Sequence, residues 1–128
     1  MNTENNNLEI NRIFASLGGL FGASGIAAYA AAAHGGAGHM STIAPILFIH
    51  APAFLALSLL AKLNRAALFG GVALALGLLF FVGDLISLEF ASHRLFPFAA
   101  PLGGSLLILG WIIVAGTAFK GLDFRRPS

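Results

Sequence analysis

Two ionisable residues lie inside long apolar stretches of the sequence, where a charge is costly. Asp84 lies in the stretch FFVGDLISLEF (80–90), and His50 lies in another apolar stretch, between Pro45 and Pro52. Ionisable residues in such surroundings are functional candidates by default, because few are retained without a partner. We therefore expect any chemistry of this chain to involve Asp84 and His50.

A third candidate, His34, ends the first apolar stretch. With a helical rise of about 1.5 Å per residue, His50 lies roughly 12 Å and Asp84 about 7 Å from the same membrane surface. One hypothesis pairs Asp84 with His50 or His34, directly or through one water, in a polar pocket open to that surface. The alternatives are a purely structural Asp84 bonded to Ser87, a carbonyl or water, and a carboxyl that reaches outward through lipid.

The other chemical readings of these histidines are weaker. His50 could simply donate to a carbonyl freed near the Pro52 kink, since proline leaves the carbonyl four residues earlier without its donor. The run HGGAGH (34–39) holds His34 and His39, but its spacing is not helical and the sequence fixes no third metal ligand. A haem between His34 and His50 needs depths that nothing in the sequence sets. We expect no metal and no cofactor, and no catalytic constellation indicates an enzyme.

The candidate residues lie in or beside four apolar stretches of the sequence. Of the 128 residues 58% are apolar and 9% are charged, against about 25% charged in soluble domains, so the surface must face lipid. Each stretch is near the roughly 20 residues needed to span a bilayer, and the connections are short enough for antiparallel neighbours. We predict an all-α, four-helix transmembrane bundle with up-down topology and a single domain over residues 1–128. The predicted helices cover 12–33, 42–61, 66–88 and 96–119.

Basic residues predict the orientation of the bundle. Six lie on one side and only Arg94 on the other, which places both termini in the cytoplasm. The six are Arg12, Lys62, Arg65, Lys120, Arg125 and Arg126. Because they are scattered singly, we expect no nucleic-acid partner. A cleavable signal peptide ending near AYAAAAH is the competing interpretation, but the apolar stretch is longer than a signal-peptide core of roughly 7–15 residues.

Small residues predict how the helices pack. In lipid, helices associate through close backbone approach at glycine and alanine. The expected packing residues are Gly18, Gly22, Gly103, Gly104 and Gly110. Pro97 suits a first helical turn, and Pro101 should bend the last helix. Trp111 lies mid-span and should fill a gap between helices, with its N–H seeking an acceptor.

Several of these features together resemble a known family. They are Ala33–His34, His50, the stretch Phe81-Val82-Gly83-Asp84-Leu85, and PLGGSLLILGW (101–111). This chain resembles the family called domain of unknown function 423, which holds the bacterial YgdD-like membrane proteins and is similar to transmembrane protein 256. The resemblance implies four transmembrane helices in an inner or organellar membrane and no established activity. Asp84 departs from the serine usual in that family, and the run before His34 departs from Gly-Ala-His-Gly.

Three functions remain as hypotheses. The first is a non-enzymatic accessory or structural module of the bacterial inner membrane, in contact with lipid and associated with itself or with a larger membrane complex. The second is a transporter or channel-like module for protons, ions or small polar molecules, although no polar residue continues the path toward the cytoplasm. The third is an outer-face metal, haem or quinone site at His34, His50 and Asp84.

Overall fold

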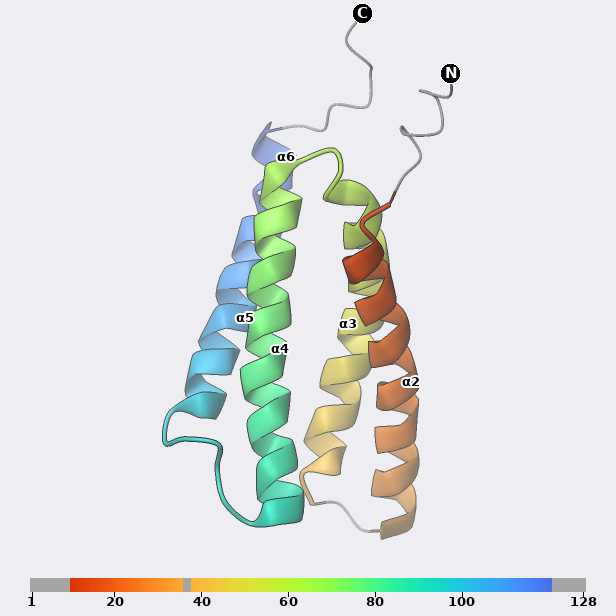
Figure 1. Cartoon of the computed structure of the whole chain (residues 1–128), viewed down its shortest axis with the longest axis vertical. Helices are drawn as coiled ribbons and strands as arrows, with labels where there is room; N and C mark the ends of the chain where they lie inside the picture. The colour runs from red at the N-terminus through yellow and green to blue at the C-terminus, as the bar shows by residue number, and fades with distance from the viewer. Residues whose placement is uncertain (1–9, 36–37, 121–128) are drawn as a thin grey trace, which may run out of the picture.

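A computed structural model describes residues 10–35 and 38–120, and most of these residues lie in helices (Figure 1). The helices are α2 (Arg12–Gly35), α3 (Met40–Leu60), α4 (Arg65–Ala91), α5 (Ala99–Ala115) and the short α6 (Thr117–Lys120). Four spans are long and apolar enough to cross a membrane, the last one comprising α5 and part of α6. The predicted all-α fold with four membrane-spanning helices is confirmed.

The helices form two antiparallel hairpins placed side by side. α2 packs along α3, and α4 packs along α5, while the contact between α3 and α4 is less extensive (Figure 1). The inner helices α3 and α4 bury a larger share of their residues than α2 and α5 do. Ile10 and Lys120 lie at one end of the molecule, which we call the terminal end. The opposite end, where α2 approaches α3 and α4 approaches α5, is the loop end.

The core between the hairpins is built from aromatic and branched side chains. The rings of Phe14 and Phe21 on α2 both meet Phe54 on α3 edge to face, with centroids 5.4 and 5.3 Å apart. Phe54, Ile43 and Leu74 are among the largest fully buried side chains. Edge-to-face contacts of this kind are the favoured arrangement of aromatic pairs, so the apolar core locks α2, α3 and α4 together.

The start of the last long helix was predicted wrongly. The sequence predicts a helix from Phe96 with Pro97 in its first turn, but α5 begins at Ala99 and Pro97 lies in the preceding turn. α4 ends at Ala91, and the next residue, Ser92, has a left-handed φ of 63°. The chain between the two helices is therefore a loop, and its backbone folds over the end of α4. Pro101 lies in the first turn of α5, where a missing N–H does not break the helix.

Proline inside α3 is accommodated without a break. Pro45 and Pro52 both lie within the helix. Pro52 has no N–H to offer to the carbonyl of Phe48, as the sequence indicates. At the same level Gly25 of α2 approaches the backbone of Phe48 so closely that a Cβ there would lie 3.1 Å from its nitrogen.

Candidate functional site

Asp84 is buried at the loop end of the seam between α4 and α5. Its side chain is fully buried, and it follows Leu74, Gly77 and Phe81 along the row of α4 that faces α5. The carboxylate accepts a hydrogen bond from Nη1 of Arg94 at 2.5 Å and from the backbone N–H of Leu95 at 2.9 Å. Both donors come from the loop between α4 and α5. Asp84 therefore faces the interior, as expected, and holds that loop against the helix end.

The expected pairing of Asp84 with a histidine is not what the structure shows. Its partners are Arg94 and Leu95 rather than His50 or His34. The physical reason is the loop geometry: the left-handed Ser92 turns the chain back, and this brings the guanidinium over the carboxylate. An arginine is also the stronger partner, because it is charged at any physiological pH and can donate several N–H groups.

Further hydrogen bonds hold the loop in this conformation. The hydroxyl of Ser87 donates to the carbonyl of His93 at 2.6 Å. Nδ1 of His93 donates to the carbonyl of Arg94 at 3.0 Å. Leu95 also packs over Gly83, where a Cβ would lie 3.3 Å from its side chain. Asp84 and Arg94 are thus the centre of a small loop-anchoring cluster.

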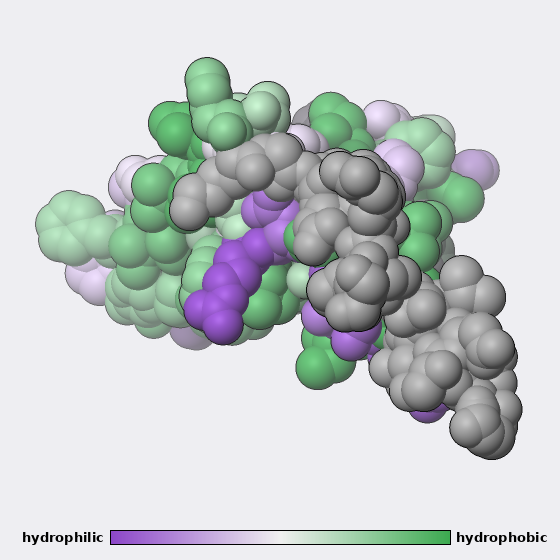
Figure 2. Space-filling view, turned by 90° about the horizontal axis from the view of Figure 1, so that it is seen from above, coloured by the Kyte–Doolittle hydropathy of each residue, from purple (hydrophilic) through white to green (hydrophobic). Residues whose placement is uncertain are grey.

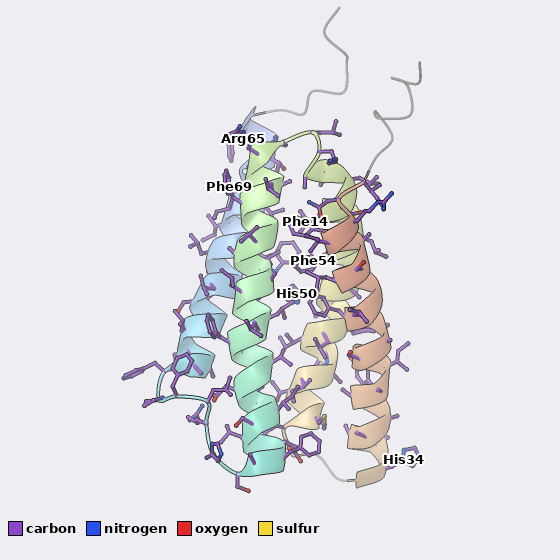
Figure 3. The ribbon with its side chains drawn as sticks, viewed as in Figure 1. Phe14, His34, His50, Phe54, Arg65 and Phe69 are labelled. Atoms are coloured by element: carbon purple, nitrogen blue, oxygen red, sulfur yellow. The ribbon has the colours of Figure 1, made fainter. Side chains whose placement is uncertain are left out.

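His50 lies near mid-height of the molecule and connects α3 to α5 (Figure 3). Its Nδ1 is 2.8 Å from the carbonyl of Ile46, and its Nε2 is 3.1 Å from Nε1 of Trp111. A carbonyl can only accept and an indole N–H can only donate. His50 is therefore the neutral tautomer with its proton on Nδ1, and both ring nitrogens are in use.

These contacts agree with two expectations and correct a third. Trp111 finds an acceptor for its N–H, and His50 donates to a backbone carbonyl, as the sequence predicts. The carbonyl belongs to Ile46 rather than to Phe48, because an i to i−4 side-chain contact reaches the preceding turn of the same helix face.

His34 lies apart from the other two candidates. It is exposed at the loop end of α2, and its Nδ1 donates to the carbonyl of Ala30 at 2.8 Å (Figure 3). The three residues expected to line one polar pocket thus belong to three separate local networks. Among the residues that the structure describes, no three His, Asp or Glu side chains are grouped so that they could hold a metal ion.

The sequence did not predict a second contact at the loop end, between Glu89 and His39. Oε1 of Glu89, near the end of α4, accepts from the backbone N–H of His39 at 2.6 Å and lies 3.2 Å from its Nδ1. His39 immediately precedes α3, so this contact joins the two hairpins. Gly38 makes room for it: a Cβ there would lie 2.6 Å from a carboxylate oxygen of Glu89, and its φ is +45°.

The sequence contains a signal for the pairing of Asp84 with Arg94. Arg94 is the one cation predicted on the side that also holds Asp84, and it follows Asp84 by ten residues. Asking which cation lies at the depth of a buried acid would have selected Arg94. No comparable signal identifies the contact between His39 and Glu89, since fifty residues separate them.

Glycines form the contact faces within each hairpin, but not all of the expected ones do. A Cβ at Gly18 would lie 2.9 Å from the Ala51 carbonyl oxygen, one at Gly103 would lie 2.7 Å from the Gly77 carbonyl oxygen, and one at Gly110 would lie 2.8 Å from the Leu74 side chain. Gly22 is only in ordinary contact with Ala51, at 3.6 Å.

Gly104 does not lie in a close helix contact, although the sequence analysis placed it among the packing residues. The nearest atom to a Cβ at this position is in the Phe81 ring, 3.9 Å away. Neighbouring residues on a helix point about 100° apart, so Gly103 and Gly104 cannot both face α4. Other glycines also have close contacts with a neighbouring helix, among them Gly25, Gly70 and Gly77.

An apolar groove lies between the hairpins. It has a volume of about 440 Å³ and is lined by side chains of α2, α3 and α4, among them Leu17, Phe21, Leu47, Leu78 and Val82. None of the ionisable residues named above lines it. In a bilayer such a groove is open to hydrocarbon, so it offers no path for a charged solute.

This fold and these contacts define a four-span integral membrane protein. The polar side chains described above bind one another or the backbone. Comparison with known sequences identifies the family within that class. The family model described as protein of unknown function (DUF423) matches residues 19–104, and the chain belongs to this family. The resemblance noted from the sequence is thereby confirmed.

A curated relative supports the membrane assignment. The chain is 35% identical over 72 residues to a "UPF0382 membrane protein" of Haemophilus influenzae (strain ATCC 51907 / DSM 11121 / KW20 / Rd). The match covers 56% of this chain and 58% of the relative. No solved structure matches the chain.

Proposed function

We propose that this protein is a non-enzymatic accessory module of the bacterial inner membrane, which associates laterally with a second copy or with a larger membrane complex. Both of its termini lie in the cytoplasm. The observation that carries the proposal is the state of three ionisable side chains of α3 and α4: Asp84, His50 and Glu89 each bind another group of the same chain. Groups committed in this way hold helices and loops together rather than bind a substrate.

The outer surface of α2 supports lateral association. Its exposed residues include the small side chains of Gly19, Ala23, Ala27 and Ala31 at four-residue spacing. A Cβ at Gly19 would meet nothing within 4 Å. Such rows allow the close backbone approach through which membrane helices associate, and the described part of the chain leaves this row exposed.

Cross-linking tests the proposed association, because the chain has no cysteine of its own. Ala23→Cys places one thiol on the small-residue row, and Ile108→Cys places a matched thiol on the exposed side of α5. Oxidation in native membranes should give a product of higher mass from Ala23→Cys and little from Ile108→Cys. Monomer alone from both variants would count against the proposal.

The rival transporter hypothesis has its own measurement. In vesicles that enclose a pH-sensitive dye, the reconstituted protein should not speed proton entry above that of protein-free vesicles. Proton flux that the Asp84→Asn variant abolishes would favour transport, and the accessory role would then be abandoned.

A further inference from the structure

The terminal end carries a surface cleft that the proposed function does not use. The cleft has a volume of about 320 Å³ and is lined by Ile10, Asn11, Arg12, Ile13 and Lys62. Its two cations come from different parts of the fold, one from the first turn of α2 and the other from the turn between α3 and α4. Figure 2 looks onto this end and shows hydrophilic side chains among apolar ones.

The cations of the cleft have no anionic partner among the residues that the structure describes. Among the described residues, the acids Asp84 and Glu89 contact Arg94 and His39, and all four residues lie at the loop end. Arg12 and Lys62 form no ion pair or side-chain hydrogen bond within residues 10–35 and 38–120. Two positive charges thus share one cleft without neutralisation from the described part of the chain.

The position of the cleft selects the chemistry of a ligand. Arg12 begins the first membrane span and Lys62 follows the second, so both lie where lipid headgroups are found. Ile13 is largely exposed beside the cations and lies one turn before Leu17, which lines the apolar groove between the hairpins. An anionic group bound by the cations would therefore have apolar surface beside it for hydrocarbon.

We propose that the cleft between Arg12 and Lys62 binds the phosphate headgroup of an anionic phospholipid, whose acyl chains lie against Ile13 and the neighbouring helix surface. Arg12 offers a planar set of donors that matches a phosphate, and Lys62 adds a mobile point charge. Basic pockets between membrane helices bind such headgroups by the same chemistry. Asn11 is held in place by its own bonds, from its N–H to the Ser58 carbonyl and from the Phe14 N–H to its Oδ1, so the backbone that carries Arg12 is anchored.

Lipid association measured by electron paramagnetic resonance tests this site. The full chain is reconstituted in phosphatidylcholine vesicles that contain a trace of spin-labelled phosphatidylglycerol or spin-labelled phosphatidylcholine. The wild-type protein should immobilise phosphatidylglycerol in preference to phosphatidylcholine. Arg12→Gln and Lys62→Gln should each lower that preference by about fivefold, the contribution of one cation near the membrane surface.

Arg65→Gln is the matched control, because it removes one charge at the same end without touching the cleft. Its preference for phosphatidylglycerol should fall clearly less than that of either cleft variant, because Arg65 lines no part of the cleft. Circular dichroism of each variant confirms that the helices are intact. Equal loss in all three variants would show a diffuse charge effect. No loss in any variant would show that the cations only orient the protein. Either result would overturn the proposed headgroup site. Competition by inorganic phosphate against the labelled lipid would also overturn it, by assigning the cleft to a soluble anion.

Discussion

Asp84 and Arg94 illustrate how an acid can persist inside a membrane protein. The carboxylate is fully buried, while the side chain of Arg94 is 48% exposed. The two partners therefore do not contribute symmetrically. If Asp84 is removed, Arg94 can return to water, but if Arg94 is removed, Asp84 cannot.

This asymmetry predicts the order of two variants. Arg94→Met should lower the free energy of unfolding by about 1–3 kcal/mol, because it leaves a buried acceptor short of a donor. Asp84→Asn should cost less, since the amide oxygen can still accept from Leu95. Unfolding in mixed detergent micelles, followed by circular dichroism, measures both. A larger loss for Asp84→Asn than for Arg94→Met would contradict the assignment.

The hydrogen bond between Trp111 and His50 predicts a coupling between α5 and α3. Trp111→Phe retains most of the apolar ring and removes only the donor, so it should cost about 1 kcal/mol. His50→Leu should cost a similar amount, and the double variant should cost less than the sum of the two. The same unfolding experiment measures all three variants. Additive losses would mean that the bond contributes nothing.

At the scale of the elements, glycine contacts determine how closely α5 approaches α4. Gly103 and Gly110 on α5 and Gly70 and Gly77 on α4 all lie in backbone contacts that leave no room for a methyl group. Gly18 does the same between α2 and α3. Without a hydrophobic driving force in lipid, this close approach is what holds each hairpin together.

The neighbouring glycines of α5 give a matched pair of variants. Gly103→Ala should separate α5 from α4 and destabilise the protein by about 1–3 kcal/mol, as overpacking does. Gly104→Ala has space for its methyl group and should be neutral or stabilise the helix by up to about 1 kcal/mol. Thermal unfolding in detergent distinguishes them. Equal midpoints for the two variants would show that the seam is placed wrongly.

At the scale of the whole molecule, the contact of Glu89 with His39 joins the hairpins at the loop end. It depends on Gly38, whose left-handed backbone and missing side chain let the carboxylate approach. Cooperative unfolding of the two hairpins should therefore depend on Gly38.

Gly38→Ala tests that dependence. The left-handed conformation alone should cost about 1–2 kcal/mol in an alanine, and the methyl group would also displace Glu89. Gly35→Ala is the control, because a Cβ there meets nothing within 4 Å. We expect a lower unfolding midpoint for Gly38→Ala only, and a broader transition if the hairpins begin to unfold separately. An unchanged midpoint and width would show that the contact does not join them.

Orientation is also a property of the whole molecule. The first and last described residues lie at the same end (Figure 1), and the six-to-one distribution of basic residues predicts that this end is cytoplasmic. A phosphatase that is active only in the periplasm should stay inactive when fused after Ser128 and become active when fused in the loop between α4 and α5. The reverse result would invert the topology.

The class of fold could be predicted from the sequence alone, because membrane spans depend on local properties. A run of about 20 apolar residues spans a bilayer wherever it occurs, and connections too short for anything else make successive helices antiparallel. The same reasoning located the buried acid, the proline positions in α3 and the need of Trp111 for an acceptor. These conclusions need only the hydropathy and the chemistry of nearby residues.

Which groups meet is known only from the three-dimensional structure. Asp84 binds Arg94 rather than a histidine because the loop after Ser92 folds back over α4, and Gly103 rather than Gly104 faces α4 because the helices pack on one side of α5. The Glu89–His39 contact joins residues fifty positions apart. Such choices depend on the direction of a loop or the rotation of a helix about its axis, and both are set by all the contacts of the bundle together.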